Sequence, residues 1–208
     1  KGNKFQNQYA RYSKRKNESI HGHKYSQFYE KFFKKVKNKN LNIFEIGSFK
    51  GNATASLFFY FENAKIYSAD LYPDLFSYKS KRIKNFKIDN SSEYDLKKFS
   101  KNIKYDIIIE DAGHYLKDQI ISLFKLFPTL KKNGLFIIEE LDFPDTRKDM
   151  NENMEKNTLY NILNLIIKKK DFKSRFISEK EKKFFLKNLK KIDILKGRFN
   201  KIAFVRKR

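Results

Sequence analysis

The chain has 208 residues, which is long enough for one α/β domain with a sizeable core and short for two. It contains no cysteine, which excludes disulfides and thiolate metal sites, and no apolar run approaches the roughly 20 residues that a membrane-spanning helix needs. The net charge of +23 is compatible with nucleic-acid binding, yet the lysines are spread along a chain poor in Gly, Ala and Pro, so we interpret the charge mainly as compositional drift.

Strands and helices alternate along most of the chain. Residues 1–24 form a polar, basic arm without clear periodicity, and apolar residues at helical spacing predict an amphipathic helix over 25–36. Buried strands are predicted at 41–47, 64–73, 85–90, 105–111 and 133–141, with helices at 52–62, 92–100 and 117–130. A polar loop at 142–157 is followed by helices over about 158–189 and by a closing antiparallel strand pair, KIDILKG and KIAFVRK.

This alternation predicts an α/β fold with a mostly parallel sheet of about seven strands and helices on both faces. We expect residues 1–40 to form an N-terminal arm and helix, and residues 41–208 to form a single Rossmann-like domain. In such sheets ligands bind at the carboxyl ends of the strands, so the residues that follow each strand are the candidate site residues. No signal peptide is visible, and we expect a cytoplasmic protein.

The first two predicted strands end in residues typical of a nucleoside-binding turn. Glu45, Gly47 and Gly51 lead into a helix N-terminus, where the backbone can approach a polar or anionic group. Asp70 follows Gly51 by about 20 residues, the spacing at which an acid accepts the ribose hydroxyls of a nucleotide. Taken singly, the glycines could mark a tight turn and Asp70 a helix cap, but together they favour a nucleoside cofactor.

Five segments carry a family resemblance: EIGSFKG, IYSADL, KIDNSS, IIIEDAGH and GLFIIEEL. They resemble the class I S-adenosylmethionine-dependent methyltransferases and, more narrowly, the metal-dependent macrocin- and mycinamicin-type sugar O-methyltransferases. That group has an Asp-Gly-Ser-His segment after the fourth strand and a Glu-Asp pair after the fifth. The matching residues here are Asp111-Ala112-Gly113-His114 and Glu139-Glu140. The resemblance covers about residues 21–142 and includes HKYSQFYEKFF, which is similar to a segment preceding the family's first strand.

The resemblance implies the fold of class I methyltransferases, with an antiparallel pair of strands after the parallel ones, and it implies S-adenosylmethionine as cofactor. It also assigns His23 and Tyr25 to a segment that closes over the cofactor or the acceptor. The candidate cofactor-binding residues are therefore Glu45, Gly47, Ser48, Gly51, Asp70, Leu71, Asp89, Asn90, Asp111, His23 and Tyr25.

Acidic residues follow the fourth and fifth strands, which are neighbours in this fold. The strand tips are about 4.8 Å apart, so Asp111, Glu139 and Glu140 are expected to converge. Three adjacent carboxylates repel one another and raise one another's pKa, and a hard divalent cation removes that cost. Oxygen ligands favour Mg²⁺ over Zn²⁺. Glu140 stands where the family has Asp and reaches further, so direct ligation by Glu140 is left open, as is a merely solvated strand end.

His114 is the candidate catalytic residue. Beside a cation that binds sugar hydroxyls, its imidazole would accept the proton of the attacking hydroxyl as a general base. A structural alternative is that His114 or Asp111 caps the helix that follows. Strand alternation turns Glu110 away from Asp111, and we assign it no functional role.

The sequence therefore favours an O-methyltransferase for a sugar hydroxyl, in a glycan, nucleotide-sugar or glycoside. One alternative is an O-methyltransferase for another hydroxylated small molecule, and another is a basic RNA-binding or RNA-methylating protein. A nucleobase N-methyltransferase is disfavoured because DAGH is not the Asn/Asp-Pro-Pro-aromatic segment of that class, and a binding module would not need three carboxylates. A fold that binds cofactor only as a scaffold is a further alternative. The oligomeric state stays open, with a homo-oligomer as one option.

Overall fold

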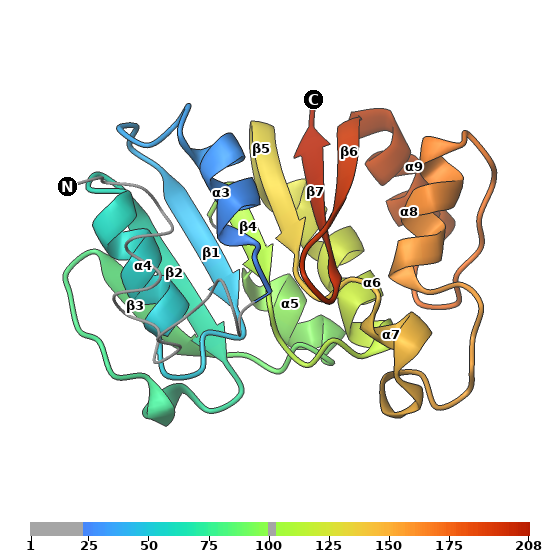
Figure 1. Ribbon diagram of the computed structural model, residues 1–208, viewed down its shortest axis with the longest axis horizontal. Coiled ribbons are helices and arrows are strands. Elements are labelled where there is room, and N and C mark those ends of the chain that lie inside the picture. The colour runs from blue at the N-terminus through green and yellow to red at the C-terminus, as the bar shows by residue number, and fades with distance from the viewer. Residues whose placement is uncertain (1–22, 100–102) are drawn as a thin grey trace.

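One sheet of seven strands runs through the computed structural model, which describes residues 23–99 and 103–208 (Figure 1). The strand order is β3-β2-β1-β4-β5-β7-β6, with β1 to β5 parallel and β7 antiparallel to both of its neighbours. The strands are β1 Asn42–Ile46, β2 Lys65–Asp70, β3 Ile83–Lys87, β4 Tyr105–Glu110, β5 Leu130–Ile138, β6 Leu189–Lys196 and β7 Lys201–Lys207. The predicted fold, including the antiparallel closing pair, is confirmed. Residues 1–22 of the predicted arm lie outside the described residues.

Helices connect the strands along nearly the whole described chain. They are α3 Ser26–Phe33, α4 Asn52–Tyr60, α5 Glu93–Phe99, α6 Leu116–Leu126, α7 Phe143–Thr146, α8 Leu159–Ile167 and α9 Glu179–Asn188, with short 3₁₀ turns η1 Pro73–Leu75, η2 Phe127–Thr129 and η3 Lys148–Met150. Two of the short elements, α7 and η3, fall in the segment predicted as a polar loop. No helix in the described ranges combines the length and apolar character of a membrane span.

Two strand boundaries differ from the prediction for identifiable reasons. β3 is an edge strand and only partly buried, so its hydrophobic pattern is weak, and its start at Ile83 rather than at 85 is not evident from the sequence. β5 already begins at Leu130, because the Asn-Gly sequence that predicts a turn instead accommodates an irregularity within the strand. Asn133 there has a φ of +61°, and the register with β4 shifts between Tyr105 and Ile107.

The sheet buries apolar residues on both faces, which explains the nearly continuous apolar runs of its central strands. Ile107 and Ile109 of β4 face the layer formed by α3 and α4. Ile108 faces the opposite layer, formed by α5, α6, α8 and α9. Figure 1 shows α3 and α4 in front of the sheet and α8 and α9 beyond its β6 edge. The carboxyl ends of the parallel strands β1 to β5 therefore all lie at the same end of the sheet.

The register brings the ends of β1, β4 and β5 side by side. Ile46 pairs with Glu110, and Glu110 pairs with Ile138, so the residues that follow them lie next to one another. Gly47 has a φ of +88°, and a Cβ added to it would lie 2.0 Å from the backbone oxygen of Asp111. Glycine is therefore required at this tip by the close approach of β4 as well as by its backbone conformation.

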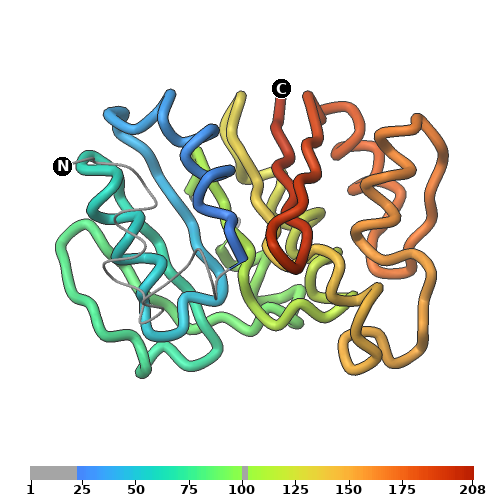
Figure 2. The backbone as a smooth tube through the Cα atoms, viewed as in Figure 1, coloured from blue at the N-terminus to red at the C-terminus, as the bar shows by residue number. Residues whose placement is uncertain are grey.

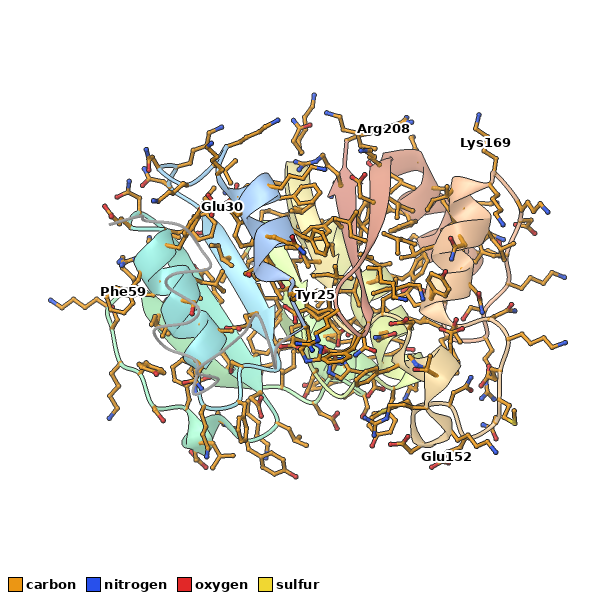
Figure 3. The ribbon with its side chains drawn as sticks, viewed as in Figure 1. Tyr25, Glu30, Phe59, Glu152, Lys169 and Arg208 are labelled. Carbon is orange, nitrogen blue, oxygen red and sulfur yellow. The ribbon has the colours of Figure 1, made fainter. Side chains whose placement is uncertain are left out.

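The β6–β7 hairpin clamps the start of α3 (Figure 2). The backbone N–H of Arg198 donates to the carbonyl of His23 at 2.8 Å, and the hydroxyl of Tyr25 donates to the carbonyl of Lys201 at 3.2 Å. A Cβ on Gly197 would lie 2.3 Å from the carbonyl oxygen of His23, so only glycine allows this approach. Figure 3 shows Tyr25 near the centre of the molecule, where it is buried.

Candidate functional site

A cavity of about 740 Å³ opens at the carboxyl ends of β1, β2 and β4. Several of its lining residues are predicted by the sequence, namely Gly47, Asp70, Leu71, Asp89, Asn90 and Asp111. Others are not, namely Phe49, Tyr72, Tyr115, Lys117, Asp118 and Glu152. Phe49, Tyr72 and Tyr115 are exposed aromatic side chains at loop positions. The sequence analysis missed these three residues because loop positions follow no hydrophobic periodicity. Large exposed aromatic side chains next to strand ends are themselves an indication of a binding site.

Asp70 is held with its carboxylate at the mouth of this cavity. The backbone N–H of Phe49 donates to its Oδ2 at 2.7 Å, and the backbone N–H of Tyr72 donates to its Oδ1 at 2.9 Å. Each carboxylate oxygen retains capacity to accept a further hydrogen bond. Asp70 can therefore accept two vicinal hydroxyls while the turn after β1 stays fixed.

Asn90 and Asp89 contribute in different ways. The amide of Asn90 is held by the hydroxyl of Ser122, which donates to it, and by Glu110, whose Oε1 accepts from its Nδ2 at 3.2 Å. Asp89 accepts from the hydroxyl and the backbone N–H of Ser91, and these hydrogen bonds lower its pKa. Asp89 thus brings a stable negative charge to the cavity, whereas the side chain of Asn90 is largely committed to the protein.

The remaining predicted cofactor residues do not line the cavity. Glu45 is buried behind it and accepts a hydrogen bond from Thr54, and burial raises its pKa to about 7. Ser48 is also buried, and Gly51 packs against the ring of Phe76. His23 and Tyr25 lie on the other side of the strand tips, with their rings stacked 5.4 Å apart.

Asp111, His114 and Glu140 form a cluster at the tips of β4 and β5. Within the described ranges, one ligand atom from each of these residues lies within 4.8 Å of the others. The Nε2 atom of His114 is 3.7 Å from Asp111 Oδ1 and 3.5 Å from Glu140 Oε2. Nε2 of His23 is 3.0 Å from Glu140 Oε1. Glu140 thus reaches the site from a longer side chain, and His23 contacts the cluster instead of the cavity.

The backbone at two of these positions is unusual. His114 has a φ of +58° and Glu140 a φ of +42°, a region that L residues with a Cβ seldom adopt. The buried side chain of Gln119 holds the second turn in place, because its amide donates to the carbonyl of Glu140 at 3.2 Å. Strained conformations that the surrounding structure enforces cluster at functional sites.

Electrostatic repulsion among the acids is strong. Burial raises the pKa of Asp111 well above its ordinary value, and the carboxylates of Glu139 and Glu140 raise it further. Burial and Glu140 raise the pKa of Glu139 to about 8. The donor set is hard oxygen with one imidazole, and the acids cannot all ionise together without a positive charge. The residues therefore fit a divalent cation such as Mg²⁺.

Burial, followed by the charges of His23 and Arg147, lowers the pKa of His114 to about 4, which favours the neutral imidazole at pH 7. The ring of Phe143 packs edge-on against His114, with centroids 5.2 Å apart, and covers it on one side.

Glu139 is turned toward α3 and accepts a hydrogen bond from the hydroxyl of Tyr29. This hydrogen bond opposes the rise in the pKa of Glu139. Tyr29 fits the apolar helical spacing of α3, so the sequence pattern places it in the core and gives no indication of its polar contact.

Comparisons with known proteins agree on the fold. No family model matches the chain. A curated relative, the 8-demethyl-8-alpha-L-rhamnosyl tetracenomycin-C 2'-O-methyltransferase of Streptomyces olivaceus, is 25% identical over 127 residues, which is 57% of this chain and 33% of the relative. The chain thus spans about one third of that protein.

Solved structures resemble the chain over its whole length. MycE, a methyltransferase from the mycinamycin pathway solved with Mg and SAH, has a TM-score of 0.79 at 19% identity and covers 99% of this chain and 55% of its own. The SAH-bound methyltransferase PaMTH1 of Podospora anserina has a TM-score of 0.59 at 13% identity and covers 100% of this chain and 89% of its own. The comparisons confirm the resemblance indicated by the sequence motifs, and the fold of this chain is the Rossmann-like methyltransferase fold.

Proposed function

We propose that the chain is an S-adenosylmethionine-dependent O-methyltransferase that methylates a sugar hydroxyl with the help of a divalent cation. The observation that carries the proposal is the position of Asp111, which lines the cavity beside Asp70 and also belongs to the cluster with His114 and Glu140. A nucleoside site and an acidic cluster that share a residue can bring a bound cofactor and an acceptor hydroxyl together.

The cavity suits the nucleoside part of the cofactor. Asp70 would accept the two ribose hydroxyls, and the exposed aromatic rings of Phe49, Tyr72 and Tyr115 would cover apolar parts of the ligand. S-adenosylmethionine supplies an already activated sulfonium methyl group. The chain's own task is then to hold the acceptor oxygen in line with that methyl group and to remove its proton.

Asp111 and Glu140 would hold the cation. Glu139, predicted as a third ligand, lies outside this cluster because its carboxylate accepts from Tyr29, and it would contribute negative charge nearby. A bound Mg²⁺ would act as a Lewis acid that lowers the pKa of a sugar hydroxyl. The repulsion among the carboxylates makes the apo site costly to ionise and thereby favours occupancy by a cation.

His114 would act as general base. Its imidazole is neutral at pH 7, which is the form that accepts a proton, and Phe143 limits the access of water to the ring. General-base catalysis of this kind contributes about 10²–10⁴-fold in rate.

The sugar acceptor is supported by the relatives. One is by name a 2'-O-methyltransferase of a rhamnosyl tetracenomycin, and MycE is solved with Mg, SAH and mycinamycin VI. The acids and the imidazole at the strand tips of this chain fit an acceptor that presents vicinal hydroxyls.

The test is methyl transfer from radiolabelled cofactor to a panel of glycosides and nucleotide-sugars with Mg²⁺. His114→Ala is expected to lose at least about 100-fold in turnover while binding SAH as the wild type does in calorimetry. Asp111→Ala is expected to lose Mg²⁺ binding as well as turnover. Asp74→Ala, which removes an exposed carboxyl group from η1, is the matched control and keeps activity. Full turnover of His114→Ala, or of the wild type in excess chelator, would refute the mechanism.

A further inference from the structure

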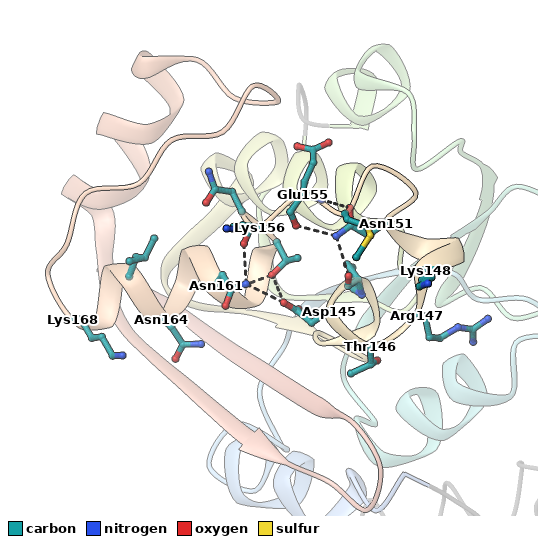
Figure 4. A pocket seen from close by; sticks show the side chains of 15 residues that line it. Asp145, Thr146, Arg147, Lys148, Asn151, Glu155, Lys156, Asn161, Asn164 and Lys168 are labelled. Atoms are coloured by element: carbon teal, nitrogen blue, oxygen red, sulfur yellow. Dashed lines mark hydrogen bonds between the residues drawn. The ribbon is translucent and has the colours of Figure 1, made fainter.

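A second cavity, of about 720 Å³, lies between the α7–η3 segment and α8 (Figure 4). Figure 4 shows Asn161, Asn164 and Lys168 following one another along α8, with Arg147 and Lys148 on the facing segment. The cavity is lined by Pro144, Asp145, Thr146, Arg147, Lys148, Asn151, Met154, Glu155, Lys156, Asn157, Thr158, Asn161, Asn164, Leu165 and Lys168.

This cavity adjoins the acidic cluster. The guanidinium carbon of Arg147 lies 5.0 Å from the centroid of the Phe143 ring, and that ring in turn packs against His114. The wall of the second cavity is therefore one aromatic ring away from the proposed general base. The two sites are thus neighbours in the fold, separated by the ring of Phe143.

Two asparagines of the lining have carboxamide oxygens without a hydrogen-bond partner among the described residues. Nδ2 of Asn161 donates to Asp145 Oδ1 at 3.0 Å and to the carbonyl of Lys156 at 2.9 Å, and Nδ2 of Asn164 donates to the carbonyl of Tyr160 at 2.9 Å. In the described part of the chain, no hydrogen bond reaches the Oδ1 atom of either asparagine. Both oxygens are acceptors that a ligand hydroxyl can satisfy.

The charge of the lining is unbalanced. The two acids are engaged: Asp145 accepts from Thr158 and Asn161, and Glu155 pairs with Arg175 at 2.6 Å. Lys148, Lys156 and Lys168 are exposed, and none of them forms an ion pair with a described residue. Three lysines of the lining are thus without an acidic partner among the described residues.

We propose that this cavity binds an anionic saccharide unit, carrying a phosphate or a carboxylate, next to the sugar that is methylated. The lysines favour a ligand that carries a negative charge. The amide oxygens favour a ligand that also presents sugar hydroxyls, which distinguishes a saccharide from a simple inorganic anion. The inference rests on the proposed function for the identity of the neighbouring unit, and it narrows the acceptor to charged glycans or sugar phosphates.

The test is a titration of the full chain, without cofactor or Mg²⁺, with glucose 1-phosphate, glucuronate, methyl glucoside or inorganic phosphate. Binding is measured from the changes in backbone amide NMR shifts. The anionic sugars are expected to shift the amides of Asn157, Asn161 and Lys168 and to bind more tightly than methyl glucoside. Lys156→Gln/Lys168→Gln is expected to weaken that binding about 2- to 30-fold. Lys65→Gln/Lys84→Gln removes the same charge from the far side of the sheet and leaves the binding unchanged.

A response to only one anionic sugar identifies the anion as phosphate or carboxylate. The proposal would be overturned if methyl glucoside or inorganic phosphate bound as tightly as the anionic sugars. It would also be overturned if the double variant Lys156→Gln/Lys168→Gln bound the anionic sugars with unaltered affinity. This binding experiment contains no cofactor, so its outcome is independent of the methyl-transfer assay. Anionic sugars that bind here, together with no methylation of any acceptor in that assay, would leave this cavity assigned and contradict the proposed function.

Discussion

Replacing Glu110 by Gln is expected to stabilise the protein above pH 8 and to change little below pH 4.5. Glu110 is fully buried, and burial raises its pKa from 4.5 to about 8. In the unfolded chain the carboxyl group keeps its ordinary pKa, so the folded state binds its proton more tightly. The stabilisation is complete below pH 4.5 and is lost as the pH rises through about 8.

The shift corresponds to about 5 kcal/mol of unfolding free energy, at about 1.4 kcal/mol for each tenfold change in proton affinity. Gln copies the protonated acid, because its carbonyl can still accept from Nδ2 of Asn90. The assay is urea denaturation across this pH range, with the exposed Glu152→Gln as control. A difference between wild type and Glu110→Gln that stays constant with pH would refute the assignment of this titration to Glu110.

Two further substitutions test the geometry of the strand tips. Gly47→Ala is expected to lower the unfolding free energy by at least about 2 kcal/mol and to weaken Mg²⁺ binding, because the added methyl group meets the backbone of Asp111 in a left-handed turn. Urea denaturation and Mg²⁺ titration measure the two effects, and unchanged values would contradict the register of β1 with β4. Asp70→Asn is expected to reduce SAH affinity about 10- to 100-fold, since hydrogen bonds to an ionised carboxylate are lost, and calorimetry that gives wild-type affinity would remove Asp70 from the ribose site.

The central strands could be predicted because they are buried on both faces. β1, β2 and β4 appear as continuous apolar runs, and the residues that follow them are polar and conspicuous. The sequence could therefore indicate three residues of the candidate site, namely Asp70, Asp111 and His114. The boundaries of β3 could not be predicted, because an edge strand with partial burial leaves little hydrophobic pattern.

Contacts between distant elements had no local sequence pattern to reveal them. Tyr29 meets Glu139, and His23 meets Glu140, only because α3 packs on one face of the sheet with its start at the strand tips. Strand alternation predicts that Glu110 turns away from Asp111, yet nothing in the sequence indicates that its carboxyl group is fully buried. The cavity along α8 depends likewise on how a polar segment folds back on a helix, which composition does not specify.

The clamp between the β6–β7 hairpin and His23 ties two distant parts of the sequence to one acidic centre. The backbone N–H of Arg198 holds the carbonyl of His23, and the imidazole of the same residue lies 3.0 Å from Glu140. The close approach of Gly197 to that carbonyl leaves no room for a side chain at the hairpin. A substitution in the hairpin, remote from the catalytic motifs in sequence, is therefore expected to reach the acidic centre through the backbone of His23.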